Sequence, residues 1–468
     1  MSDVIAQIFN LENCIVDTYD IAYTDDGKEY SLVKAHYSGE LPKKCPHCGG
    51  TYYKHGARKV TVLDTPLGGK PTMIEISFPR LRCTGCGKMY SPELASIDEK
   101  RRVTNRAKLD ITEKCLRNTF EDVTNEYLTT GPSVKNIFED FLEDNKDKLR
   151  FKTPVFLGID EIKIRGLSEI TVITDLEHHT LYDILPKRDA KALKEYFSQL
   201  PDRESVLWVC SDMYKPFENP ISGALPNAQW AIDHFHLVAY ANRALDDVRK
   251  TIQGSMRKNE RLKTKKGLAY TLKTRYDQLD ADDAENIRIL RTKPKYAPLA
   301  TAFDLKEAFF NIYDENPTSV DNAKQAFEDW ANSIPSDPLF DKFRELVKTT
   351  RHFYVQIFNY WNCPIAISNG FTECTNRLIR ENNCRGRGYS FEILRGRTLY
   401  RKTNIKNALK GGTLIGPAVT ETEVPFHFNS RSEDFDDFAD DIVEFEGELV
   451  NSETGEVMQI TDNQESNQ

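Results

Sequence analysis

The chain has 468 residues, a net charge of −9 and an ordinary globular composition, which is enough for roughly two to four domains. Its longest apolar runs, such as residues 154–159, fall far short of the ~20 residues that a membrane span needs. We therefore expect no membrane association. The first residues, Met1-Ser2-Asp3-Val4, lack the basic-then-apolar layout of a signal peptide, which favours a cytoplasmic protein.

The net charge conceals an asymmetry between the C-terminal tail and the rest of the chain. From Arg431 to Gln468, thirteen acidic residues accompany a single arginine, which gives the tail a charge of −12. The other 430 residues therefore carry +3 of the total of −9, so a negatively charged partner is not excluded. A tail of this composition is expected to be disordered.

Two pairs of cysteines follow an N-terminal stretch that predicts a short strand pair within residues 1–40. Each pair has the CxxC spacing that holds thiolates around a tetrahedral Zn²⁺ ion, and the residues between them predict a β-hairpin. Free cysteines in loops, or a histidine ligand from His47 or His55, are the alternatives. The pattern predicts a structural zinc site at Cys45, Cys48, Cys83 and Cys86.

A basic stretch that includes Arg101 and Arg102 comes next, and the residues from Asn105 to Leu116 then show helical periodicity. A helix over residues 120–128, a break at Thr130-Gly131-Pro132 and a second helix from Ser133 predict a helix-turn-helix. Two helices that merely pack together would show the same break. If the motif binds DNA, the expected contacts are Arg101, Arg102, Lys135 and Asn136.

An apolar strand around residues 155–164 carries two carboxylates, Asp160 and Glu161, in its middle. Buried carboxylates are costly unless they are paired or bind a metal. The charges could simply face solvent or pair with a basic side chain. However, a second apolar strand ends in Asp212, and two strands that each deliver an aspartate predict a metal-binding site on a sheet.

The order of elements after residue 151 is three antiparallel strands, a helix, a strand, a helix and a strand that ends before Asp233-His234-Phe235-His236. This order predicts a ribonuclease H-like α/β fold. Charged helical sequence fills residues 237–362. Ten basic residues and only Glu260 as an acid lie between Arg249 and Arg275, so we expect phosphate contacts there, including Lys263, Lys265 and Lys266.

A last helix begins near Gly370 and supplies a third acid, Glu373. Asn376, Arg377 and Arg380 follow at i+3, i+4 and i+7, which places them on the same helix face as Glu373. We therefore expect these three residues to contact DNA beside the carboxylate site.

With these motifs in view, the chain resembles the DDE-type transposases of bacterial insertion sequences, in particular the ISL-three group. The resemblance runs from the zinc motif to about Leu409. It rests on the two CxxC pairs, Gly158-Ile159-Asp160-Glu161, Asp233-His234-Phe235-His236, Ser368-Asn369-Gly370-Phe371-Thr372-Glu373 with Asn376, and Arg385-Gly386-Arg387-Gly388-Tyr389.

The resemblance implies a catalytic triad of Asp160, Asp212 and Glu373, with Asp233 and His236 forming an Asp-x-x-His element. Asp233 also follows a strand, so the choice of the second catalytic aspartate stays open. Paired Mg²⁺ or Mn²⁺ ions held by such acids can activate a nucleophile and stabilise the leaving oxygen in phosphoryl transfer. The implied partners are double-stranded DNA, as terminal inverted repeats and as target, and further copies of the chain in a homodimer or higher oligomer.

These inferences predict an α/β protein of six segments. They are a zinc-binding module over 1–95, a helix-turn-helix domain over 96–150, the core over 151–236, a basic helical insertion over 237–362, the rest of the core over 363–410 and the acidic tail over 411–468. We predict a bacterial, nucleoid-associated transposase that cleaves and joins DNA. A zinc-containing DNA-binding regulator and a nuclease that does not join strands are the alternatives.

Overall fold

The computed structural model describes residues 8–146, 151–187, 189–256, 267–316 and 318–401, with two short segments at 449–450 and 457–458. Two compact units divide these residues. The first contains the described residues of 8–233 and 363–401, and the second contains those of 234–362 with the segments 449–450 and 457–458. Within the described part of the chain, no helix combines the length and the apolar composition needed to cross a membrane.

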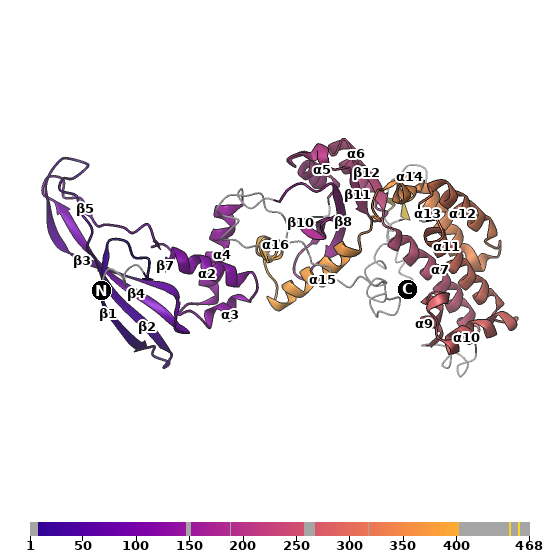
Figure 1. Ribbon diagram of the computed structural model, residues 1–468, viewed down its shortest axis with the longest axis horizontal. Helices are drawn as coiled ribbons and strands as arrows, with labels where there is room; N and C mark the ends of the chain where they lie inside the picture. The colour runs from indigo at the N-terminus through magenta and orange to yellow at the C-terminus, as the bar shows by residue number, and fades with distance from the viewer. Residues whose placement is uncertain are drawn as a thin grey trace, which may run out of the picture. The chain divides into compact units, whose positions relative to one another are not determined.

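The first unit begins with a seven-stranded sheet, which includes the predicted strand pair and hairpin (Figure 1). A Gly68-Gly69 turn joins the two hairpin strands, and both residues have positive φ values. Glycine suits these positions because it adopts such angles without strain. The strands are β1 Cys14–Tyr23, β2 Glu29–Tyr37, β3 Tyr52–Leu67, β4 Lys70–Cys83, β5 Met89–Tyr90, β6 Ile97–Asp98 and β7 Val103–Thr104.

Three helices follow: α2 Asn105–Cys115, α3 Phe120–Thr124 and α4 Gly131–Asn145. The helix predicted over residues 120–128 ends four residues early. The helix predicted from Ser133 begins at Gly131, because the Thr130 side chain caps it by accepting a hydrogen bond from the Ser133 N–H. Pro132 is compatible with this first turn since it needs no N–H partner there.

The core sheet has the strand order β10-β9-β8-β11-β12. Strands β8, β9 and β10 are antiparallel neighbours, whereas β11 pairs in parallel with both β8 and β12. The elements are β8 Phe156–Lys163, β9 Glu169–Asp175, β10 Thr180–Leu185, α5 Ala190–Ser198, β11 Trp208–Ser211, α6 Glu218–Ala224, β12 Gln229–Ile232, α15 Gly370–Arg385 and α16 Phe391–Tyr400. Asp189 caps α5 as predicted.

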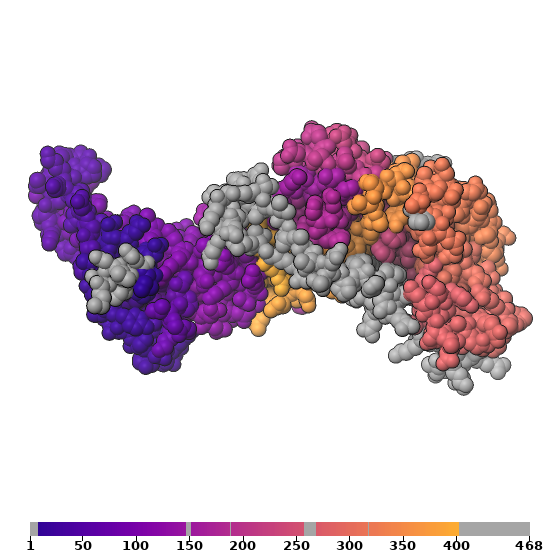
Figure 2. All heavy atoms as spheres, viewed as in Figure 1, coloured from indigo at the N-terminus to yellow at the C-terminus, as the bar shows by residue number. Residues whose placement is uncertain are grey.

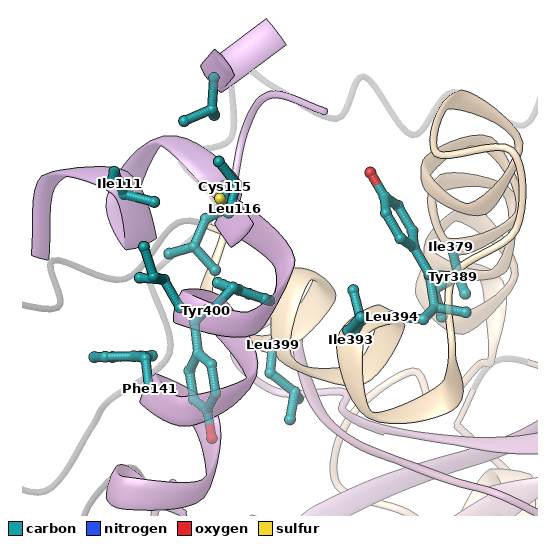
Figure 3. Packing of buried hydrophobic residues seen from close by; sticks show 14 of the residues in the cluster. Ile111, Cys115, Leu116, Phe141, Ile379, Tyr389, Ile393, Leu394, Leu399 and Tyr400 are labelled. Atoms are coloured by element: carbon teal, nitrogen blue, oxygen red, sulfur yellow. The ribbon is translucent and has the colours of Figure 1, made fainter. Parts of the chain in front are cut away.

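One hydrophobic core joins this sheet to α2, α3, α4, α15 and α16. Helix α15 packs on β8 and β9, and α16 packs on β10 and α4. In Figure 2 the orange atoms of the α15–α16 segment lie directly against the purple atoms of the preceding helices. Figure 3 shows Leu399 and Tyr400 of α16 beside Leu116 and Phe141. The three helices are thus packed onto the core that carries the acids.

The second unit is helical, as predicted for residues 237–362. Its helices are α7 His234–Gly254, α9 Gly267–Lys273, α10 Ala281–Thr292, α11 Ala297–Asp314, α12 Val320–Ser333, α13 Asp341–His352 and α14 Tyr354–Phe358. Lys306 is fully buried and donates to the carbonyl oxygens of Leu272 and Thr274, both at 2.9 Å. These bonds satisfy the C-terminal carbonyl groups of α9 and fix it to α11.

Candidate active site and zinc site

Three neighbouring strands bring three aspartates to the same level of the core sheet. Gly158 of β8 pairs with Cys210 of β11, so Asp160 and Asp212 each lie two residues beyond a paired position. Ser211 pairs with Ile232 of β12, so Asp212 and Asp233 are each the next residue. Asp160 itself lies inside β8, opposite Val172, because β8 extends past the end of β11. Asp233 is completely buried.

The first turn of α15 places Glu373 over this part of the sheet. Helix α15 can approach β8 so closely because Gly158 has no side chain: a Cβ atom there would lie 2.5 Å from Thr174 Oγ1 and 2.6 Å from Thr372 Oγ1. The two hydroxyl groups are hydrogen-bonded at 2.7 Å, and Asn369 Nδ2 donates to the Ile159 carbonyl oxygen at 2.8 Å. These contacts fix the start of α15 to β8 and β9.

The acids are close enough to influence one another electrostatically. Burial raises the pKa of Glu373 well above its ordinary value, and the negative charges of Asp233 and Asp160 raise it further. Carboxylate oxygens of Asp233 and Glu373 and a ring nitrogen of His236, three residues after Asp233, lie within 4.8 Å of one another. Asp160 and Asp212 are not in that compact group. A cation would relieve the repulsion between the carboxylates.

The donor set fits a divalent cation. Hard cations such as Mg²⁺ and Mn²⁺ prefer oxygen ligands, and the Asp233 and Glu373 carboxylates supply them beside the ring nitrogen of His236. His236 Nε2 and Asn376 Oδ1 are both buried, and neither has a hydrogen-bond partner among the described residues. Buried polar atoms are ordinarily satisfied, so two such atoms in residues that accompany the acids indicate a missing ligand.

The four predicted zinc ligands form a second cluster, in the N-terminal sheet. The sulfur atoms lie within 4.8 Å of one another, with Cys45–Cys86 at 3.7 Å and Cys48–Cys83 at 3.4 Å. Zn–S bonds of about 2.3 Å in a tetrahedron separate sulfurs by roughly 3.8 Å, so the cluster fits zinc. A hydrogen bond from Tyr52, with the His47 N–H, lowers the pKa of Cys45 to about 6, which favours the thiolate.

Comparisons with known proteins agree with both sites. A family model described as "Transposase" matches residues 157–398, just over half of the chain. A model described as "zinc-finger of transposase IS204/IS1001/IS1096/IS1165" matches residues 41–86. The chain belongs to the ISL-three group of insertion-sequence transposases. The zinc prediction is therefore supported by both the sulfur cluster and the zinc-finger match.

Similar transposases extend the match over most of the chain. The transposase for insertion sequence element IS1001 of Bordetella parapertussis is 22% identical over 353 residues, which cover 74% of this chain and 85% of the relative. The transposase for insertion sequence element IS1557 of Mycobacterium tuberculosis (strain H37Rv) is 24% identical over 375 residues, which cover 72% and 80%. Membership of this family makes the chain a DNA-cleaving enzyme of the transposase type.

The residues predicted to contact DNA differ in their surroundings in this transposase. Arg101 makes a two-bond ion pair with Asp140, with 2.5 and 2.8 Å between the bonded atoms. Arg102 and Lys135 are exposed, and Lys135 lies 3.7 Å from Glu139. Asn136 is partly buried. Lys263, Lys265 and Lys266 lie outside the described residues.

The three α15 residues predicted to contact DNA differ in burial, although their helical spacing places them on one face. Arg377 is exposed and Arg380 is partly exposed, but Asn376 is buried and donates from Nδ2 to Asp160 Oδ2 at 2.6 Å. Asn376 is thus directed at the acids, although its contact with DNA stays a prediction. The supporting residues Thr174, Thr372 and Asn369 were not predicted from the sequence. Two of them stand inside the Ser368–Glu373 motif, which was the only available signal.

Proposed function

We propose that this transposase binds the terminal inverted repeats of an insertion sequence and catalyses divalent-metal-dependent DNA cleavage and strand transfer. The observation that carries the proposal is that carboxylate oxygens of Asp233 and Glu373 lie within 4.8 Å of each other, close enough to Asp160 that its charge also raises the pKa of Glu373. Asp212 completes the set, because it follows β11 at the level of Asp160 and Asp233. We keep Asp160, Asp212 and Glu373 as the proposed catalytic triad.

The core is proposed to be ribonuclease H-like. The proposal is supported by three antiparallel strands that are followed along the chain by two strands joining the sheet in parallel. This arrangement supports the proposal because it sends the ends of β11 and β12 to the same edge of the sheet, next to Asp160. A helix that crosses β8 then supplies the third acid.

Each protein group has a definable task in such a reaction. Divalent cations, when bound, activate the attacking oxygen and stabilise the leaving oxygen. Asp160, Asp212 and Glu373 would hold the cations as carboxylates, and bound cations would offset the burial and the neighbouring negative charges that raise the pKa of Glu373. His236 is proposed to orient the scissile phosphate or to transfer a proton, with Asp233 beside it.

Recognition of DNA is proposed to reside mainly in the first 150 residues, through the zinc ribbon and the α2–α4 helices. The basic segment from Arg249 to Arg275 would add phosphate contacts that are insensitive to sequence. Arg377 and Arg380 lie on the acid-bearing helix and would hold DNA beside the site. An oligomer and a nucleoid-associated location in the bacterial cytoplasm complete the proposal.

The test uses purified full-length protein, labelled DNA that carries the element's ends, and Mg²⁺ or Mn²⁺. We expect metal-dependent cleavage at the ends and joining to a target. End binding without any metal-dependent nicking would favour a DNA-binding regulator, and cleavage without joining would favour a nuclease. In the same assay, His236→Ala should slow cleavage by about 10²-fold and leave binding intact. Parental cleavage with a lower melting temperature would make His236 a packing residue.

A further inference from the structure

Asn376 lies one turn after Glu373 on α15, and its carboxamide contacts a catalytic acid. Only 5% of the residue is exposed. Its Nδ2 atom donates a 2.6 Å hydrogen bond to Asp160 Oδ2, while Asp160 Oδ1 accepts from the Glu161 N–H at 2.8 Å. Asp160 therefore has one oxygen oriented by α15 and the other by its own strand.

The carboxamide oxygen of Asn376 is buried and has no hydrogen-bond partner among the described residues. The amide cannot be turned around to remove this problem, because its oxygen would then face the Asp160 carboxylate, which accepts but does not donate. Leaving a buried acceptor without a hydrogen bond destabilises the folded protein. We therefore expect the Asn376 carboxamide oxygen to bind a group that is not part of the protein.

Two neighbouring asparagines on the same segment have hydrogen bonds at both the nitrogen and the oxygen of their carboxamide groups. Asn369 donates to the Ile159 carbonyl oxygen and accepts from the Thr372 hydroxyl group. Asn383, two turns beyond Asn376, donates to the Arg165 carbonyl oxygen and accepts from the Tyr389 N–H. Both amide ends of these residues are satisfied by protein atoms. The open oxygen thus occurs at the asparagine that touches a catalytic acid.

We propose that Asn376 is a fourth protein ligand of the active-site cation, binding it through Oδ1 while Nδ2 orients Asp160. The inference rests on the proposed metal-dependent function. An asparagine carbonyl oxygen is a good ligand for a hard cation, and it adds no negative charge to a site where Glu373 already experiences Asp160 and Asp233. The spacing supports this role, because residues at i and i+3 lie on one side of a helix.

The proposal is tested by titrating the full-length protein with Mn²⁺ and following its thermal unfolding. The part of the Mn²⁺-dependent change in melting temperature that is lost in Glu373→Gln is assigned to Mn²⁺ binding at the active site. Asn376→Leu should raise the Mn²⁺ concentration at the midpoint of that part by about 10- to 100-fold, the range typical for residues that support a metal site. Asn383→Leu is the matched control: it should lower the melting temperature but leave the Mn²⁺ midpoint unchanged.

A second variant separates ligation from simple orientation of Asp160. Asn376→Cys replaces the carboxamide with a thiol, whose sulfur Mn²⁺ accepts as a ligand more readily than Mg²⁺ does. If the side chain is a ligand, the preference for Mn²⁺ over Mg²⁺ in binding and in cleavage should rise by about tenfold. An unchanged preference for Mn²⁺ over Mg²⁺ would overturn the proposal. This test holds even if Asn376→Leu fails to fold.

The outcomes also separate this inference from the proposed function. An Mn²⁺ midpoint that is unchanged in folded Asn376→Leu but lost in Glu373→Gln would overturn ligation by Asn376 and leave the catalytic acids in place. Equal Mn²⁺ responses of the parent and Glu373→Gln would instead contradict the metal site itself. A raised midpoint together with the Mn²⁺ preference of Asn376→Cys would establish Asn376 as a ligand.

Discussion

Gly158 of β8 lies so close to Thr372 of α15 that a Cβ atom on the glycine would come within 2.6 Å of the threonine hydroxyl oxygen. The Thr174 hydroxyl oxygen would be equally close, at 2.5 Å. This narrow contact sets the distance between the strand that carries Asp160 and the helix that carries Glu373. The geometry of the acids therefore depends on a residue that has no side chain.

Gly158→Ala should push α15 away from β8 and uncouple the acids. Forcing a methyl group into such a contact costs about 1–3 kcal/mol. We expect a lower melting temperature and a loss of DNA cleavage that exceeds any loss of DNA binding. Gly254→Ala is the control, because a Cβ atom there meets nothing within 4 Å. Normal cleavage by folded Gly158→Ala would show that the close approach does not matter.

Glu373→Gln should stabilise the metal-free protein while abolishing cleavage. The folded-state pKa of Glu373 is raised above 4.5, so the folded state holds its proton to higher pH than the unfolded state. Its contribution to stability therefore falls as the pH rises from about 4.5 through the folded-state pKa. Thermal unfolding without metal from pH 4 to 8 should show this decline in the parent, and less of it in Glu373→Gln. Identical pH profiles would contradict the electrostatic coupling.

Asp212→Ala, like Asp160→Ala and Glu373→Ala, should abolish Mg²⁺-dependent cleavage and joining but leave end binding intact. The reason is that these carboxylates are proposed to hold the metals and to take no part in recognising the ends. Asp233→Ala provides the comparison, because Asp233 lies in the compact group with Glu373. Cleavage assays and gel-shift assays on the same preparations test this. Robust cleavage by Asp212→Ala with none by Asp233→Ala would make Asp233 the second catalytic carboxylate.

Cys83→Ser should release zinc and destabilise residues 40–95. Structural zinc contributes directly to the folding free energy of small modules, so loss of one thiolate ligand is costly. We expect a reduced zinc content, faster proteolysis of this region and weaker binding to the transposon ends. Cys384→Ser, which changes an exposed cysteine outside the cluster, should retain the zinc. Purified parental protein without bound zinc would refute the assignment.

Arg102→Ala and Lys135→Ala should weaken binding to end DNA, because both side chains are exposed on the proposed recognition region. Losing a phosphate contact should also reduce the salt dependence of binding. Arg101→Ala should act differently: it removes the ion pair with Asp140 and mainly lowers the melting temperature. DNA affinities at several salt concentrations, measured beside melting curves, distinguish the two effects. A loss of affinity in Arg101→Ala at unchanged stability would place Arg101 at the DNA instead.

The sequence by itself determined the features that depend on short stretches of chain. The CxxC pairs, the succession of strands and helices along the core, the cap at Asp189 and the helix that carries Glu373 all follow from local spacing and apolar patterns, and the structure contains each of them. Such patterns work because turn, cap and strand preferences are set by neighbouring residues. Helix ends were less accurate, as α3 and α4 show, because single capping contacts decide them.

Only the tertiary structure decided which side chains meet across long separations in the chain. The periodicity of α15 put Asn376 with Arg377 and Arg380 on one face, but the packing of α15 on β8 buried Asn376 against Asp160, 216 residues away. The packing of whole elements also produces the ion pair between Arg101 and Asp140 and the short distance between the carboxylates of Asp233 and Glu373. A hydrogen bond or an ion pair requires atoms to be placed within a fraction of an ångström, and that placement comes from how whole elements pack, which helical or strand periodicity does not specify.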